Sequence, residues 1–197
     1  MISLNNDPTE ELGSLHAGGQ AKYIVELGKN LLFHNFKILL ITLGDGIKGT
    51  HHEIAPGFDV YRVMRMDGRP YGYDFKVSEI SSIFDQCKQL IATFESNITV
   101  IFSFYWISGL LGLKLKNHLS VPHVIKFCSL GLYKQSAMEQ ADLTERVSSE
   151  RHICHNCEAI VATTNVEKRT LVEQYGAPEE IVRVIAGGID LTLFNTR

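Results

Sequence analysis

The feature that most constrains the fold is a regular alternation of short apolar runs with segments of helical periodicity. Runs such as Lys37–Leu43, Ile98–Phe102 and Ala159–Thr163 are almost entirely apolar, which is typical of strands buried on both faces of a parallel sheet. Between them, apolar residues recur every three or four positions, as on the buried side of a helix. This alternation predicts an α/β fold: a Rossmann-like, doubly wound, mainly parallel sheet of about six strands with helices on both faces.

The sequence also predicts where these elements begin and end. The expected helices cover about Gly19–His34, Lys76–Phe94, Ser108–Leu119 and Met138–Cys157, and a last one follows Thr164. Thr164 is expected to cap that helix, with Glu167 as its capping-box partner, and Gly176 to end it in the left-handed conformation. The remaining expected strands are Ile2–Leu4, Phe58–Val63, His123–Phe127 and Val182–Ile185. The segment Gly44–Gly57 is expected to be a loop.

Composition indicates one domain without a broad anionic partner. No Pro-, Gly- or Ser-rich linker divides the 197 residues, so a single domain over residues 1–197 is expected. The net charge of -3 argues against a broad surface for nucleic acid or anionic membranes. No apolar run reaches the roughly 18 residues of a membrane-spanning helix. The acidic start, MISLNNDPTEE, lacks the layout of a signal peptide, so a cytoplasmic protein is expected.

Two motif-like segments do not meet the requirements of the sites that they resemble. Gly44–Gly49 (GDGIKG) has the spacing G-x-G-x-x-G, but no helical pattern follows, whereas a dinucleotide-binding motif opens a helix. A dinucleotide oxidoreductase is therefore the weakest hypothesis. His152, Cys154, His155 and Cys157 resemble half a zinc site, but a second ligand pair is missing. Helix packing and surface histidines are expected there, with no metal, and the chain's four cysteines are expected to be free thiols.

The segment Gly18–Gln20 lies between the loop after the first strand and the first helix. Two glycines allow a ligand to approach the backbone closely, and the N–H groups at a helix N-terminus favour an anionic or polyhydroxylated ligand. A plain tight turn before a helix would have the same pattern, and position alone leaves both interpretations open. In open α/β sheets ligands bind beyond the carboxyl ends of the strands, where this loop is expected to lie.

Four segments, taken in order, resemble retaining glycosyltransferases of family 4. They are DPTEELGSLHAGGQAKYIVELGKNL, FYWISGLLGLKLKNHLSVPHVI, CSLGLYKQ, and CEAIVATTNVEKRTLVEQYG with VRVIAGGIDLTLF. The third resembles an H-S-L-G-x-x-K loop, and the last resembles the end of the N-terminal domain in these enzymes. The nearest branches are the sucrose-phosphate synthases, the sucrose synthases and the enzymes of mycothiol-type biosynthesis.

The resemblance implies a GT-B fold, in which two Rossmann-like domains face a cleft. The N-terminal domain mostly binds the acceptor and the C-terminal domain holds the nucleotide sugar. The chain ends at Arg197, so the donor domain is expected to be absent and residues 1–197 alone are expected to be inactive. The parent enzyme is expected to transfer a hexosyl group from a nucleotide sugar to a hydroxyl or sugar-phosphate acceptor, with retention and without a cofactor. An exposed interdomain face could also drive self-association.

The resemblance further implies a set of acceptor- and diphosphate-binding residues and assigns no catalytic residue. The set is Gly18, Gly19, Gln20, Lys22, Lys76, Cys128, Ser129, Lys134, Arg146 and Glu150. The first three match the glycine-rich loop of the family. The lysines and the arginine match positions that bind the acceptor's phosphate in synthases using a sugar phosphate.

Two positions depart from the family pattern. Phe104 and Cys128 stand where the family usually has histidine, and the second of these histidines lies near the transferred sugar. A thiol is a weak hydrogen-bond donor and cannot replace the two nitrogens of an imidazole. The departures are compatible with a subfamily that uses different acceptors. They also motivate a second hypothesis, a non-catalytic binding or assembly domain that kept the fold.

Overall fold

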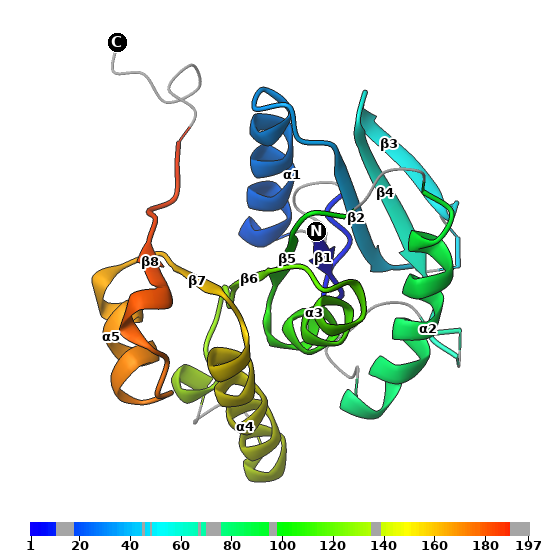
Figure 1. Cartoon of the computed structure of the whole chain (residues 1–197). Helices are drawn as coiled ribbons and strands as arrows, with labels where there is room; N and C mark the ends of the chain where they lie inside the picture. The colour runs from blue at the N-terminus through cyan, green and yellow to red at the C-terminus, as the bar shows by residue number, and fades with distance from the viewer. Residues whose placement is uncertain are drawn as a thin grey trace.

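The computed structural model describes residues 1–10, 18–44, 46–47, 49–66, 68–69, 76–94, 98–134 and 139–189. Within these residues the core is one sheet of eight strands in the order β3-β4-β2-β1-β5-β6-β7-β8 (Figure 1). The strands are β1 Ile2–Ser3, β2 Ile38–Leu43, β3 His51–Ala55, β4 Phe58–Val63, β5 Ile101–Phe104, β6 His123–Lys126, β7 Ala159–Ala162 and β8 Val182–Val184. All neighbouring strands are parallel except β3 and β4.

Helices cover both faces of this sheet. They are α1 Gly19–Leu32, α2 Ile80–Ile91, α3 Trp106–Leu119, α4 Gln140–Asn156 and α5 Asn165–Glu173, with short 3-10 turns η1 Val77–Glu79, η2 Gly131–Lys134 and η3 Glu179–Ile181. Helix α1 packs on one face, and α2, α3 and α4 pack on the other (Figure 1). The predicted Rossmann-like α/β architecture is therefore confirmed.

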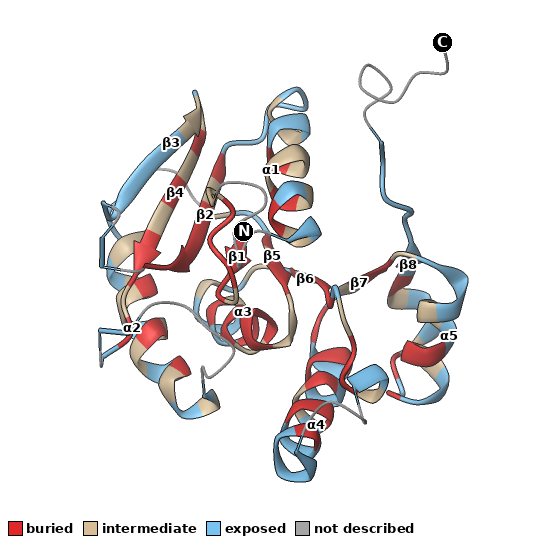
Figure 2. Cartoon of the chain, turned by 180° about the vertical axis from the view of Figure 1, so that it is seen from behind, coloured by how far each residue is buried: buried red, intermediate tan, exposed pale blue. Residues whose placement is uncertain are grey.

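The core lies between these layers, and its packing sets how closely α1 approaches the sheet. Buried residues concentrate in the central strands and on the inner sides of α3 and α4 (Figure 2). A Cβ atom at Gly28 of α1 would lie 2.2 Å from Cε1 of Phe58 in β4, a distance that no side chain tolerates. Glycine at this position therefore lets the C-terminal half of α1 pack closely against β4.

Most predicted boundaries are confirmed, and the departures have local causes. Strand β3 was expected to be loop because its residues, HHEIA, are polar and mostly exposed, so the apolar pattern of a strand is absent. It pairs antiparallel with β4 at the edge of the sheet, and the sheet has eight strands instead of about six. Strand β5 starts at Ile101, three residues later than expected. Met138, the expected start of α4, lies outside the described residues.

The predicted caps of α5 are present. The Thr164 hydroxyl accepts a hydrogen bond from the Glu167 backbone N–H at 3.1 Å. The Glu167 carboxylate in turn accepts from the backbone N–H of Thr163 at 2.7 Å, one residue before the cap. Gly176 has a φ of +73°, as a left-handed C-terminal residue requires.

Packing explains the histidines and cysteines at the end of α4 that resemble half a zinc site in the sequence. Cys154 and Cys157 are buried in the core cluster formed with β6 and β7, whereas His152 and His155 are exposed. All four cysteines are free thiols, as predicted.

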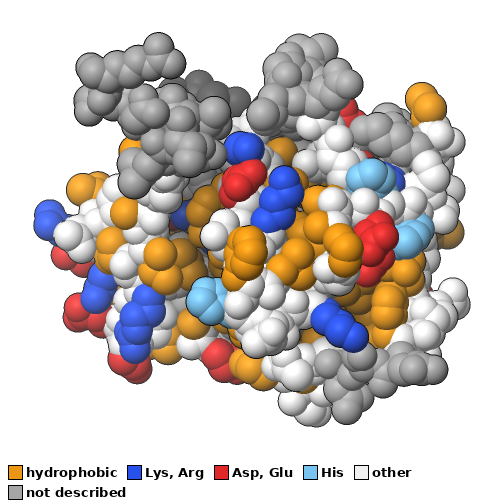
Figure 3. Space-filling view, turned by 90° about the horizontal axis from the view of Figure 1, so that it is seen from above, with side chains coloured by type: hydrophobic (Ala, Val, Ile, Leu, Met, Phe, Trp, Pro, Cys, Tyr) orange, Lys and Arg blue, Asp and Glu red, His pale blue; other side chains and the backbone are white. Residues whose placement is uncertain are grey.

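None of the described helices has the length and apolar character that crossing a bilayer requires. On the face drawn in Figure 3, the described lysine and arginine side chains are scattered among acidic and apolar ones. This distribution agrees with the small net charge and with the absence of a broad basic patch on that face.

Candidate functional site

A polar crevice of about 420 Å³ lies beyond the carboxyl ends of the central strands. Its lining residues come from the loops after these strands, from the ends of β6 and η2, and from the N-terminal halves of α1 and α4. They are Asn5, Gly19, Gln20, Tyr23, Tyr105, Lys126, Cys128, Ser129, Lys134, Arg146, Thr163 and Gly187. Open parallel sheets bind ligands at this edge, so the crevice is the candidate site.

The N-terminus of α1 forms one wall of the crevice. Gly18 precedes the helix with φ -96° and ψ -176°, an extended conformation that any residue can adopt. A Cβ atom at Gly18 or Gly19 would meet nothing within 4 Å. Neither backbone conformation nor protein packing therefore requires these glycines. The interpretation that favours close approach of a ligand accounts for them better than a tight turn does.

The loop after β1 is fastened to α1 by paired amides. The Asn5 side chain donates to Gln20 Oε1 at 3.1 Å, and the Gln20 side chain donates to Asn5 Oδ1 at 2.9 Å. The first N–H groups of α1 have no partner within the helix and sit at its positive end. This wall of the crevice therefore offers backbone donors in a fixed position.

Arg146 and Glu150 form a buried pair that holds the opposite wall. Arg146 Nε lies 2.9 Å from Glu150 Oε1, and Arg146 Nη2 donates to the Ser129 backbone carbonyl at 2.7 Å. The Glu150 carboxylate also accepts the Gly131 N–H at 2.9 Å and the Tyr175 hydroxyl at 2.6 Å. Burial and this carboxylate raise the pKa of Tyr175. Glu150 thus lies behind the crevice and positions both the arginine and the loop after β6.

Lys126, which ends β6, is a buried cation of the crevice that sequence reasoning missed. Its side chain is buried, with the residue 7% exposed, and Nζ donates to Thr163 Oγ1 at 2.6 Å. The ammonium also lies 5.1 Å from the centre of the Tyr23 ring. Among the described residues, no carboxylate forms an ion pair with Lys126 or with Lys134. Lys126 and Lys134 therefore bring positive charge to the crevice that no carboxylate of the described residues neutralises.

Two residues lining the crevice have strained backbones. Tyr105, after β5, has φ +75°, and Cys128, after β6, has φ +61°. They are joined through the end of β6, because the Tyr105 N–H donates to the Lys126 carbonyl at 2.9 Å. Left-handed conformations of non-glycine residues cost about 1–3 kcal/mol each and concentrate at functional sites. The strain supports the assignment of this edge as the site.

The crevice brings together most of the residues predicted from the sequence. Gly19, Gln20, Cys128, Ser129, Lys134 and Arg146 line it, Gly18 is exposed beside it, and Glu150 supports it. Lys22 and Lys76 do not line it. Lys22 pairs with Glu26 at 2.8 Å on the exposed side of α1, because it does not share the helix side of Gln20 and Tyr23. Lys76 lies at the start of η1 and donates its backbone N–H to Glu79.

Other lining residues had weak or no signals in the sequence. Asn5, Tyr105, Thr163 and Gly187 are ordinary loop residues whose position depends on the tertiary structure. Lys126 could have been found as the one charge in an otherwise apolar strand. Phe104, the first departure from the family pattern, is fully buried and stacks on Phe102 with ring centres 4.6 Å apart. Gly49 leads toward β3 and not into a helix, which disfavours dinucleotide binding.

Comparison with known proteins identifies related sequences and folds. The model of Glycosyltransferase Family 4 matches residues 17–193. D-inositol 3-phosphate glycosyltransferase of Thermomonospora curvata is 28% identical over 206 residues, which cover 100% of this chain and 47% of the relative. Mannosylfructose-phosphate synthase of Agrobacterium fabrum is 28% identical over 200 residues, which cover 91% of this chain and 42% of the relative. The chain thus spans about half the length of these curated relatives.

Solved structures share the fold. Sucrose-phosphate synthase from Thermosynechococcus elongatus superposes with a TM-score of 0.85 at 24% identity, over 98% of this chain and 48% of that one. Anabaena HepE, in complex with UDP and glucose, superposes with a TM-score of 0.62 at 13% identity, over 100% of this chain and 46% of HepE. The eight-stranded sheet is therefore a Rossmann-like lobe of the GT-B type.

Proposed function

The chain belongs to Glycosyltransferase Family 4, and we propose that it is the acceptor-side, N-terminal domain of a GT-B hexosyltransferase. In this proposal the parent enzyme transfers a hexosyl group from a nucleotide sugar to a hydroxyl of a sugar-phosphate acceptor, with retention. The domain comprises residues 1–197, and a separate lobe holds the nucleotide sugar. We also propose a cytoplasmic location, which the four free thiols support because such thiols persist in reducing compartments.

The observation that carries the proposal is the uncompensated positive charge of the crevice. Lys126 and Lys134 line it without a carboxylate partner among the described residues, and Arg146 lies beside them. A phosphate monoester carries about two negative charges near neutral pH and accepts several charge-assisted hydrogen bonds. The names of the relatives also include phosphorylated polyols or sugars. A phosphorylated acceptor therefore fits the crevice better than a neutral sugar does.

The wall formed by α1 supports the proposal that the crevice also contacts the donor diphosphate or the hydroxyls of the acceptor. Gly19 and Gln20 line the crevice at the positive, N-terminal end of a 14-residue helix. Their position suits the diphosphate of a donor or the hydroxyls of an acceptor. Catalysis would then come from positioning the two substrates and from stabilising charge on the leaving diphosphate. No step in this scheme needs a cofactor.

A binding experiment on residues 1–197 tests the acceptor assignment directly. Calorimetric titration is expected to show binding of fructose 6-phosphate or an inositol phosphate, and binding at least about ten-fold weaker for the unphosphorylated parent compounds. The variant Lys134→Gln should weaken binding about five-fold, since a charge-assisted contact at an exposed site contributes about 1 kcal/mol. Lys29→Gln, at an exposed position of α1 away from the crevice, is the matched control. Equal affinity for the phosphorylated and unphosphorylated compounds would refute the assignment.

Transfer activity needs a separate measurement. A protein joining this chain to a nucleotide-sugar lobe like that of its relatives should turn over with one member of a donor panel. Residues 1–197 alone should show none, because half of the catalytic cleft would be missing. Absence of binding and turnover with every nucleotide sugar would refute the hexosyltransferase proposal.

Cys128 favours one alternative, a non-catalytic domain that kept the fold. This residue stands where the family has histidine, and it lines the crevice as a free cysteine. The variant Cys128→His in the two-lobed protein separates the alternatives, and histidine tolerates the left-handed backbone found there. Gain of transfer activity from an inactive parent would mean that the chemistry has been lost, whereas an active parent would contradict the non-catalytic alternative.

A further inference from the structure

The turn η2 carries Lys134, a cation of the crevice that pairs with no carboxylate of the described residues. The turn has four residues, Gly131–Lys134, and Lys134 is the last of them. A single 3-10 turn makes few hydrogen bonds of its own, so its position depends on contacts with other elements. The contacts that hold η2 therefore also decide where the Lys134 ammonium lies.

Tyr175, which follows the end of α5, contacts this turn from the side of the core. Its hydroxyl accepts a hydrogen bond from the Leu132 backbone N–H at 3.0 Å and donates one to Glu150 Oε2 at 2.6 Å. Burial and the Glu150 carboxylate raise the pKa of Tyr175, so the hydroxyl stays protonated and can donate. Because Tyr175 is 1% exposed, bulk water does not replace either partner.

Glu150 of α4 holds the preceding residue of the turn. Its Oε2 atom accepts the Gly131 N–H at 2.9 Å, and the same oxygen accepts the Tyr175 hydroxyl. A Cβ atom at Gly131 would lie 3.1 Å from Glu150 Oε2 and 3.1 Å from Val147 Cγ2, so η2 rests on α4 without spare room. Two consecutive N–H groups of the turn are thus bound by one buried pair of a hydroxyl and a carboxylate.

A third contact joins η2 to α5. The Tyr133 hydroxyl donates a hydrogen bond to Thr170 Oγ1 at 2.8 Å. Tyr133 is exposed, whereas Thr170 is buried near the end of the helix. Each of the three residues before Lys134 therefore has a partner outside the turn, and the segment Thr170–Tyr175 supplies two of these partners.

We propose that Tyr175 is a positioning residue of the crevice, which holds η2 against α4 and thereby sets where Lys134 meets the phosphate of the acceptor. The identity of this ligand rests on the proposed function, whereas the contacts of η2 do not depend on it. Without the Tyr175 hydroxyl, the Leu132 N–H loses its acceptor and Glu150 loses a donor. The turn would then be fixed less firmly from the side of α5, and Lys134 would move with it.

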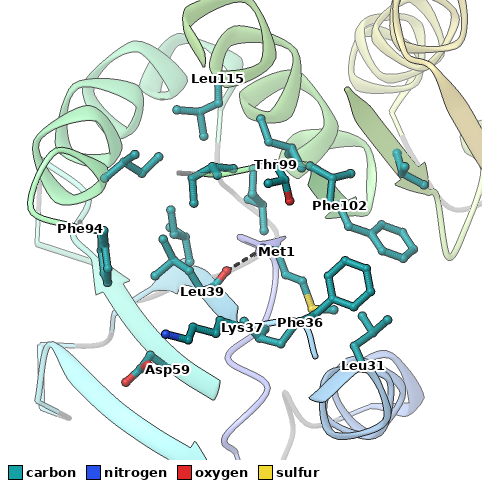
Figure 4. A pocket seen from close by; sticks show the side chains of 18 of the residues that line it. Met1, Leu31, Phe36, Lys37, Leu39, Asp59, Phe94, Thr99, Phe102 and Leu115 are labelled. Atoms are coloured by element: carbon teal, nitrogen blue, oxygen red, sulfur yellow. Dashed lines mark hydrogen bonds between the residues drawn. The ribbon is translucent and has the colours of Figure 1, made fainter. Parts of the chain in front are cut away.

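A larger cavity, of about 620 Å³, lies at the opposite, amino edge of the sheet and is separate from this network. It is lined largely by apolar side chains, such as those of Leu31, Phe94 and Leu115 (Figure 4). The buried lysine and the helix N-terminus, which attract phosphate, line the crevice instead. Titration with a sugar phosphate is therefore expected to report on the crevice.

The test removes the Tyr175 hydroxyl from the chain of 197 residues by the substitution Tyr175→Phe. Amide exchange at Leu132, measured by NMR, is expected to be at least about ten-fold faster than in the parent, because the N–H has lost its acceptor. The dissociation constant for fructose 6-phosphate should rise about three-fold, less than the about five-fold rise expected for Lys134→Gln. The control Ser103→Ala removes another buried hydroxyl with a hydrogen bond of 2.6 Å, outside the crevice lining, and should change neither quantity.

A double-mutant cycle separates positioning from a general loss of stability. If Tyr175 acts through Lys134, the protein with both substitutions binds about five-fold more weakly than the parent, as Lys134→Gln does alone. Independent effects would multiply to about fifteen-fold and would overturn the proposal. Tyr133→Phe removes only an exposed contact of the same turn and should weaken binding about two-fold, which provides the test if Tyr175→Phe does not fold.

Three further results would overturn the proposal. They are unchanged exchange at Leu132 in Tyr175→Phe, equal weakening of binding by Ser103→Ala, and, where Tyr175→Phe does not fold, unchanged affinity in Tyr133→Phe. Equal affinity of the parent for fructose and fructose 6-phosphate would instead refute the acceptor assignment. Exchange at Leu132 would then still decide whether Tyr175 holds η2.

Discussion

Replacing Lys126 by methionine separates a ligand-binding role from a structural one, because the two roles predict losses of different quantities. The substitution Lys126→Met removes the ammonium group and keeps a similar unbranched side chain. If the ammonium holds an anionic ligand, affinity must fall. If it holds the fold together, stability must fall instead.

The structure sets the size of both effects. The hydrogen bond from Nζ to Thr163 Oγ1, 2.6 Å long, stabilises the fold by about 1.5–3 kcal/mol. The contact with the Tyr23 ring at 5.1 Å adds about 1–2 kcal/mol. Burying the ammonium without a carboxylate costs several kcal/mol, which offsets both. The free energy of unfolding of Lys126→Met is therefore expected within about 1 kcal/mol of the parent, or above it.

The loss of affinity should be much larger. A charge-assisted hydrogen bond to phosphate contributes about 1.5–3 kcal/mol, so the dissociation constant for fructose 6-phosphate should rise about 10- to 150-fold. Calorimetric titration measures this change, and urea unfolding measures stability on the same samples. Lys114→Met, at an exposed position of α3, is the control. A variant that loses more than about 2 kcal/mol of stability and keeps its affinity would refute the reasoning.

Three further predictions concern stability and the crevice. Burial lowers the pKa of His123 to about 4, so this residue stays neutral in the folded state, whereas in the unfolded chain it takes up a proton below its ordinary pKa of 6.5. The free energy of unfolding therefore includes about 3 kcal/mol from neutral His123 that is present above pH 6.5 and lost as the pH falls toward 4. Urea unfolding of His123→Gln should show a free energy of unfolding that depends less on pH over this range. Gly28→Ala should lose about 1–3 kcal/mol of stability through its clash with Phe58, whereas Gly19→Ala should keep stability and weaken ligand binding. Glu150→Gln removes the buried carboxylate that pairs with Arg146 at 2.9 Å and should lower the free energy of unfolding by about 3 kcal/mol, measured in the same way.

The elements that could be predicted are those whose signals are local. The apolar run of β2 and the helical periodicity of α2 indicate that these elements are buried, because a strand or helix covered by its neighbours must be apolar on the covered side. The capping threonine of α5 acts within four residues of sequence, and it was found for the same reason. Strand β3 was missed because an exposed edge strand needs no apolar pattern, only hydrogen bonds to β4.

The residues of the candidate site also fall into those that the sequence predicted and those that it did not. The ordered motifs of a known family indicated Gly19, Ser129 and Arg146, and the structure brings them to one crevice. They could not show that Lys22 turns away on the exposed side of α1. They also did not reveal Lys126, because a single lysine at the end of a strand has no local pattern that distinguishes it from a surface charge.

The amino-acid sequence by itself therefore determined the α/β class, most strand and helix boundaries and the family, since each depends on patterns within short segments. Only the tertiary structure decided which charges meet, which backbones are strained and where cavities open. Those properties depend on distances between residues such as Asn5 and Gln20, or Lys126 and Thr163, which lie far apart in the chain. Packing of α1 and α4 against the sheet sets these distances, and no periodicity in the chain encodes them.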